Sequence, residues 1–199
     1  GIHFAGNEPM DAEDLSAEFR VGYDAATNAL YVALDVRDAD RGTVVFPPEP
    51  QEYEYDAAYV WVRVPSKDEP QARPLGFIAG LGKAERSTVN IFGTWCLNLD
   101  PPVHFVSATV REASQWRCEY RIDIGSLTQG QHRLAPGQAI EFNLWLYSVD
   151  TLPGGFESEE MSWVAPAPPH QPDGRGYVLL VPSNVSLGRL SGQVRLWDG

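Results

Sequence analysis

Apolar and polar residues alternate along most of this chain, in short segments separated by turn residues. Alternation with a period of two is typical of strands that bury one face. Segments 17–23 and 29–37 flank the turn-like run Asp24-Ala25-Ala26-Thr27-Asn28, which predicts a hairpin. Further strands are predicted at 55–64, 75–81, 87–97, 103–111, 115–124, 138–148 and 176–182. The pattern predicts an all-β fold, with the Pro- and Gly-rich segment 150–174 as a surface loop.

Three of these predicted strands carry an aromatic or charged face opposite an aliphatic one. If they are neighbours, their outward residues form a surface that suits a sugar, because C–H faces stack on aromatic rings while polar groups bond the hydroxyls. The alternative is a second small core beneath the 150–174 segment. The candidate ligand-binding residues from this pattern are Tyr59, Trp61, Arg63, Glu119, Arg121, Asn143, Trp145 and Tyr147.

Composition and charge narrow the range of partners. The chain has 199 residues, with 15 Lys plus Arg against 27 Asp plus Glu, a net charge of −12. Because no basic cluster offsets this charge, we expect neither nucleic acid nor an anionic membrane as a partner. No apolar run approaches the roughly 20 residues that span a bilayer, so we expect no direct membrane insertion.

Three aspartates near the end of one predicted strand, Asp35, Asp38 and Asp40, form a candidate metal site. Calcium prefers such oxygen ligands, which makes it the cofactor that this cluster predicts. The alternative is a solvated acidic turn. The two cysteines leave a similar choice, since Cys96 and Cys118 could form a disulfide or remain free apolar side chains.

Catalytic chemistry has little support in the sequence. There is no nucleophile elbow, and the four histidines form no metal-binding motif. Glycoside hydrolysis needs only two carboxyl groups, for which Glu119 or Glu141 with Asp123 is the first pair to test. Since 27 acidic residues supply such pairs by chance, we expect no enzyme activity.

Several separated segments carry a more specific signal through their serial order. They are DLSAEFRV at 14–21, ALYVALDVRD at 29–38, YDAAYV at 55–60, WRCEYRI at 116–122, IEFNL at 140–144, Asp150, Ser162-Trp163 and GYVLL at 176–180. In order and spacing they resemble the family 9 carbohydrate-binding modules and the related DOMON sandwiches. The resemblance implies a two-sheet antiparallel β-sandwich of jelly-roll or immunoglobulin-like type. It also implies non-catalytic sugar binding, frequent calcium, and an exported multidomain parent, extracellular or periplasmic.

The chain departs from that family at the sugar site. Sugar-binding members stack the ring between two tryptophans; at the first place this sequence has Tyr53, and within 168–171 it has no aromatic residue. Tyr59 and Trp145 stand where the family has a carboxylate and an amide. We therefore expect a carbohydrate-binding module of unspecified sugar, with Tyr53 added to the candidates. The alternative is a structural or sensory protein-interaction sandwich that has lost the site.

Two further expectations concern the haem-binding variant and the domain limits. Some DOMON sandwiches bind haem through Met and His, but Met10 and Met161 have no convincing His partner here. We expect residues 1–183 to form the sandwich module. Residues 184–199 are expected to be a linker and the first strand of a following domain, or an extra strand. Other domains of the parent chain would then be partners.

Overall fold

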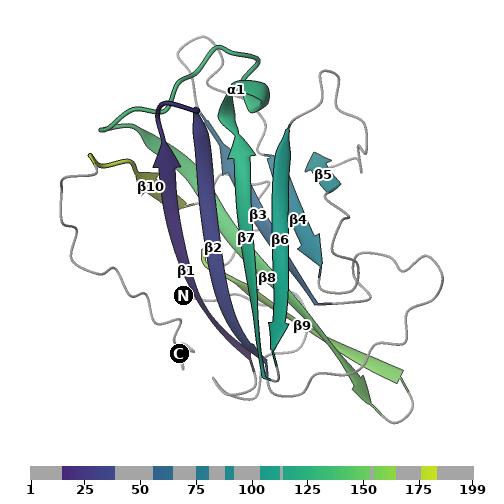
Figure 1. Ribbon diagram of the computed structural model, residues 1–199. Helices are drawn as coiled ribbons and strands as arrows, with labels where there is room; N and C mark the ends of the chain where they lie inside the picture. The colour runs from purple at the N-terminus through teal and green to yellow at the C-terminus, as the bar shows by residue number, and fades with distance from the viewer. Residues whose placement is uncertain are drawn as a thin grey trace.

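The computed structural model describes residues 15–38, 56–64, 75–80, 88–91, 104–112, 114–152, 155–164 and 176–182. These ranges form ten strands and one helix of four residues, and the strands build two antiparallel sheets (Figure 1). The predicted all-β, two-sheet antiparallel architecture is confirmed. No helix in the described ranges is long and apolar enough to cross a membrane. The division at residue 183 stays a prediction, since residues 183–199 lie outside them.

The smaller sheet has four strands in the order β1-β2-β7-β6. Its strands are β1 (Leu15–Asp24), β2 (Ala29–Asp38), β6 (Phe105–Glu112) and β7 (Gln115–Asp123). The predicted hairpin joins β1 to β2, in a register that runs from Leu15 opposite Asp38 to Asp24 opposite Ala29. The Asp24 carboxylate closes the turn by accepting bonds from the Ala26 amide and the Thr27 hydroxyl, which lowers the pKa of Asp24.

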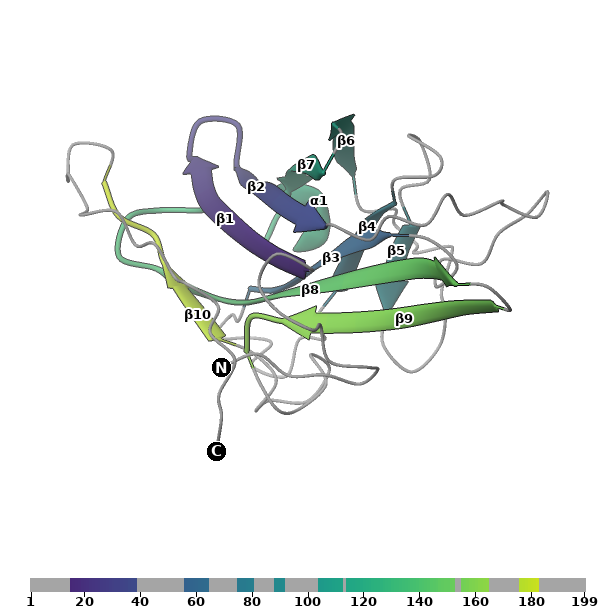
Figure 2. The ribbon, with the colours of Figure 1, turned by 90° about the horizontal axis from the view of Figure 1, so that it is seen from below.

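The larger sheet has six strands, in the order β10-β8-β3-β4-β5 with β9 also paired to β8. Its strands are β3 (Ala57–Arg63), β4 (Leu75–Gly80), β5 (Thr88–Ile91), β8 (Ala139–Leu152), β9 (Gly155–Ser162) and β10 (Gly176–Leu179). The predicted 150–174 loop is wrong over its first part, because β8 continues to Leu152 and β9 returns along it (Figure 2). β9 begins at Gly155, three residues after β8 ends at Leu152, so the chain forms a hairpin here instead of a long loop.

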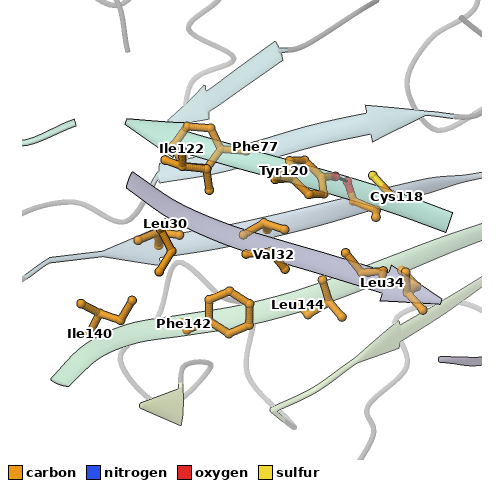
Figure 3. Packing of buried hydrophobic residues seen from close by; sticks show 14 of the residues in the cluster. Leu30, Val32, Leu34, Phe77, Cys118, Tyr120, Ile122, Ile140, Phe142 and Leu144 are labelled. Atoms are coloured by element: carbon orange, nitrogen blue, oxygen red, sulfur yellow. Dashed lines mark hydrogen bonds between the residues drawn. The ribbon is translucent and has the colours of Figure 1, made fainter. Parts of the chain in front are cut away.

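The core lies between the two sheets, as the aliphatic faces predicted. Leu30, Val32 and Leu34 of β2 lie opposite Phe142 and Leu144 of β8 (Figure 3). The Tyr120 hydroxyl of β7 donates a hydrogen bond to the carbonyl oxygen of Ala58 in β3, so a polar link crosses the core. Cys118 is a free, buried thiol, and burial raises its pKa to about 12. Of the two alternatives for the cysteines, Cys118 therefore matches the free apolar side chain rather than the disulfide. Cys96 lies outside the described residues.

The helix α1 (Ile124–Leu127) directly follows β7. The Asp123 carboxylate caps it by accepting a bond from the Ser126 amide at 3.0 Å. This is a common way to satisfy an unpaired amide at a helix start. Asp123 therefore has a structural role at the end of the smaller sheet.

Candidate ligand-binding site

The strands β3 and β8 are neighbours, as the sugar-surface hypothesis required. Their ladder places Tyr59 opposite Trp145, Trp61 opposite Asn143 and Arg63 opposite Glu141. All six residues alternate with core residues of the same strands, so they share the face of the larger sheet that is turned away from the core. We call these six residues the outer face of the larger sheet.

The centre of this face is buried rather than open. Trp61 is 3% exposed and Asn143 is 0% exposed. A Cβ atom at Gly76, opposite Trp61 on β4, would lie 3.0 Å from the indole ring. Because Gly76 has no side chain, the indole packs closely against β4 at this position and, being buried, offers no stacking platform. The prediction of an open surface is therefore wrong at Trp61 and Asn143. These two residues are buried, as the alternative prediction of a second small core required.

An ion pair lies at one end of the same face. Arg63 Nε is 2.7 Å from one carboxylate oxygen of Glu141, and Arg63 Nη2 bonds the other. The side chains of Arg63 and Glu141 are only 14% and 5% exposed. Hydrogen bonding to Glu141 raises the pKa of Arg63. This bidentate pair holds both side chains against the sheet, so its first role is structural.

Asn143 bonds backbone rather than presenting its amide at the surface. Its Oδ1 accepts bonds from the Leu144 amide at 2.8 Å and from the Val164 amide at 3.2 Å. The Ser162 hydroxyl donates to the Val164 carbonyl oxygen at 2.6 Å. Asn143 therefore fastens the chain that leaves β9 to the outer face of the larger sheet.

The partly exposed aromatic residues of the face are Tyr59 and Trp145. Trp145 lies between Tyr59 on β3 and Ser162 on β9. Its indole N–H is buried and meets no acceptor among the residues that the structure describes. Tyr53 and the Tyr147 side chain lie outside that part of the structure, so their predicted contacts stay predictions.

No family model matches the chain, and no curated protein sequence matches it. Among solved structures, a family 9 carbohydrate-binding module from Caldicellulosiruptor kristjanssonii in complex with glucose is similar, at TM-score 0.59 and 15% identity over 92% of this chain and 87% of that one. The complex of such a module with cellotriose from the same organism gives TM-score 0.59 and 16% identity, over 95% and 88%. This chain has the family 9 fold.

A third similar structure comes from Bacteroides uniformis. It is a candidate carbohydrate-binding protein, with TM-score 0.52 and 12% identity over 90% of this chain and 86% of that one. The predicted resemblance to the family 9 modules is confirmed at the level of the fold. At these identities the likeness concerns the path of the chain and does not extend to the residues of the site.

Two predicted ligand-binding residues lie elsewhere on the family 9 fold. Glu119 and Arg121 belong to β7, which pairs with β2 and β6 in the smaller sheet. Their outward side chains are therefore on the opposite side of the sandwich from Tyr59 and Trp145. The assumption that all three predicted strands are neighbours is wrong for β7, because alternation identifies an outward face without identifying the sheet.

The proposed calcium ligands are also separated. Asp35 is on the outer face of the smaller sheet, where its carboxylate lies 2.9 Å from Arg117 and 3.5 Å from Arg20. Asp38 is buried on the inner face, and the Ser148 hydroxyl donates to it at 3.4 Å. Asp35 and Asp38 therefore do not fit one calcium ion, and the described residues hold no cluster of three metal-ligating side chains. Asp40 lies outside them. Calcium at this strand end stays a prediction that thermal unfolding with calcium or with chelator tests.

The structure does not bring together the carboxyl groups that were the first candidates for glycoside hydrolysis, Glu119 or Glu141 with Asp123. Glu141 is in the larger sheet and Glu119 and Asp123 are in the smaller one. Along β7, Glu119 and Asp123 are four residues apart, or about 13 Å at the rise of a strand. Glycosidases hold their two carboxyl groups within roughly 5 to 9.5 Å. The geometry gives these carboxylates no common catalytic site.

Three residues important to this face were not among the predicted ligand-binding residues. Glu141 has the same parity as Asn143 and Trp145, so alternation alone could have included it. Tyr177 of β10 lies opposite Glu141 and is 67% exposed, which makes it an open aromatic ring beside the ion pair. Gly76 carries no pattern that could have revealed the indole packed on it.

Proposed function

We propose that this chain is a non-catalytic carbohydrate-binding domain. The observation that carries this proposal is the likeness of the fold, over 92% and 95% of the chain, to modules solved with glucose and with cellotriose. The glucose units of these ligands make cello-oligosaccharides the first class of sugar to test. A location outside the cytoplasm and further domains in the parent chain belong to the same proposal and rest on the family resemblance.

We place the ligand beside Tyr59 and Trp145 on the outer face of the larger sheet. Both rings are partly exposed, and they are direct cross-strand neighbours. Sugar rings stack on such aromatic side chains through their C–H faces. Tyr53 and Tyr147 stay candidates for the same site on the strength of the sequence pattern and the family resemblance. Beneath it, Trp61, Asn143 and the Arg63–Glu141 pair act as positioning residues, because they are buried or engaged with other protein groups.

Calorimetric titration with cello-oligosaccharides, guided by a glycan array, tests this placement. Trp145→Ala should weaken binding by at least about fivefold, since a stacked ring contributes about 1 kcal/mol beyond its buried area. Trp145→Phe keeps a ring and should retain most of the affinity. Tyr31→Ala is the matched control, because Tyr31 is an exposed ring on the smaller sheet.

Circular dichroism and thermal unfolding establish that each of these variants is folded. An unchanged affinity in folded Trp145→Ala rejects this placement of the site. Equal losses in Trp145→Ala and Tyr31→Ala reject it as well, because the two rings lie on different sheets.

A second candidate function is a protein-interaction sandwich without a sugar site. The burial of Trp61 and Asn143 favours it, because the centre of the outer face of the larger sheet is covered and offers no open platform for a sugar. A glycan array without signal, together with a specific protein ligand, would support this alternative. Binding of a cello-oligosaccharide that depends on Trp145 would exclude it as the main function.

A further inference from the structure

The smaller sheet ends in β6, a strand whose second edge is paired with no strand in the described part of the chain (Figure 1). β6 has eight residues, FVSATVRE, with neither Pro nor Lys. Along the middle of the strand its outward side chains are apolar, since Val106 is 61% exposed, Val110 is 58% exposed and Ala108 between them is also exposed; the outward charge of Glu112 stands at the strand end. An edge of this length and composition is a template for another strand.

The opposite edge of the same sheet is built differently. The outward side chains of β1 include the exposed charges of Glu18 and Arg20. Charges of this kind are a usual protection of edge strands against pairing with other chains. The two edges of one sheet therefore differ, because β1 carries exposed charges along its middle whereas β6 carries charges only at its end, in Arg111 and Glu112.

The backbone of β6 is oriented for pairing. The Asp123 amide donates to the His104 carbonyl oxygen at 3.0 Å, next to the pair formed by Phe105 and Ile122. His104 and the other even-numbered residues therefore direct their backbone groups toward β7, because bonded pairs alternate along an antiparallel ladder. Ser107, Thr109 and the other odd-numbered residues direct theirs to the second edge.

We propose that a second copy of this chain pairs with β6 in antiparallel orientation, around a two-fold axis at Ala108. In this register Ser107 exchanges backbone hydrogen bonds with Thr109 of the partner subunit. Val106 lies against Val110 of the partner subunit, and His104 lies against Glu112 of the partner subunit. The two four-stranded sheets become one continuous sheet.

This register is complementary in packing and in hydrogen-bonding groups. The valine pairs fall at positions without backbone hydrogen bonds, where opposed side chains come closest. At the two ends of the paired strands, the His104 imidazole N–H is placed to donate to the carboxylate of Glu112 of the partner subunit. A two-fold axis repeats each of these contacts, which is the usual geometry of a homodimer. The proposal does not depend on the sugar site, which lies on the other sheet.

Light scattering and sedimentation over a wide range of protein concentration test this dimer. The wild-type chain should reach twice the monomer mass. Val106→Lys combined with Val110→Lys should weaken the dimer at least tenfold, because each lysine then faces another across the axis. Glu18→Lys is the control, since it adds the same two units of positive charge on the opposite edge and should leave the dimer unchanged. Val106→Glu with Val110→Glu should pair with the double-lysine variant when the two are mixed.

Disulfide trapping tests the register. Ala108→Cys should oxidise to a covalent dimer, because a central pair without hydrogen bonds brings the two Cα atoms to about 4.5 Å. Val106→Cys should not link to itself, since it faces position 110 of the partner. A wild-type chain that stays monomeric overturns the proposal, whatever other chain then pairs with β6. A dimer that survives the double-lysine variant overturns it too, because another surface must then hold the copies together.

Discussion

The outer faces of the two sheets have the same alternating sequence pattern, but their side chains differ in exposure to water. On the larger sheet, Trp61 is packed over Gly76, and Arg63 and Glu141 form an ion pair that is largely buried. On the smaller sheet, Asp35 and Arg117 form an ion pair with side chains that are 44% and 57% exposed. An outward position on a strand is therefore no guarantee of exposure, and the two faces should respond differently to equivalent substitutions.

The largest expected difference concerns the two ion pairs. Glu141→Gln should lower the free energy of unfolding by about 3 kcal/mol, because it removes the carboxylate charge that pairs with the largely buried Arg63 guanidinium. Asp35→Asn should change it by at most about 1 kcal/mol, since water screens an exposed pair. Urea unfolding of both variants measures the two values. Equal losses would mean that the larger sheet is no better shielded from water than the smaller one.

A smaller difference is expected for two glycines that lie within strands. Gly76→Ala should destabilise the protein by about 1 to 2 kcal/mol, because the new Cβ lies 3.0 Å from the buried Trp61 ring. Gly22→Ala should stabilise it by about 0.5 kcal/mol, because nothing lies within 4 Å of its added Cβ and alanine loses less backbone entropy on folding. Thermal unfolding of the two variants gives the comparison, and a neutral Gly76→Ala would show that the Trp61 ring can move.

A third comparison separates the inner and outer faces of β7 by the reactivity of a thiol on each. The Cys118 thiol should react with a disulfide reagent about a thousandfold more slowly near pH 8 than the thiol of Glu119→Cys, because burial raises the pKa of Cys118 to about 12. The difference between wild type and Cys118→Ala isolates this residue from Cys96. Rapid reaction of Cys118 in the folded protein would contradict its burial.

The same thiol makes stability depend on alkaline pH. Its folded pKa of about 12 lies above the ordinary value of 9.0, so the folded state keeps a proton that the unfolded state loses. Its contribution is complete below about pH 9 and is lost as the pH rises toward about 12, at about 1.4 kcal/mol per pH unit. Cys118→Ala should lack this part of the decline, which denaturant unfolding at several alkaline pH values can measure.

Much of the fold followed from local pattern. The hairpin of β1 and β2, the aliphatic faces of β2, β3 and β8, and the strand nature of β7 were all predicted. The β8–β9 hairpin was missed because its glycines and proline read as a continuous loop. Pattern recognises turn residues, but it does not show whether the chain after them pairs back onto the strand before them.

The candidate site was only partly predictable. The pairs Tyr59 with Trp145 and Trp61 with Asn143 required that β3 and β8 be neighbours, which the structure confirms. Glu119 and Arg121 met the same alternation rule and lie on the other sheet. The local sequence of β7 does not reveal which of the two sheets it joins, because strands of both sheets alternate with the same period of two.

Alternation along the chain was enough to determine which side chains of each strand oppose its core residues, since that property depends only on neighbouring residues. The tertiary fold alone decided which strands pair, that Trp61 rests on Gly76, and that Asp35 and Arg117 remain in water while Arg63 and Glu141 are withdrawn from it. These outcomes depend on contacts between segments far apart in the chain, and burial is a property of those contacts rather than of any single strand.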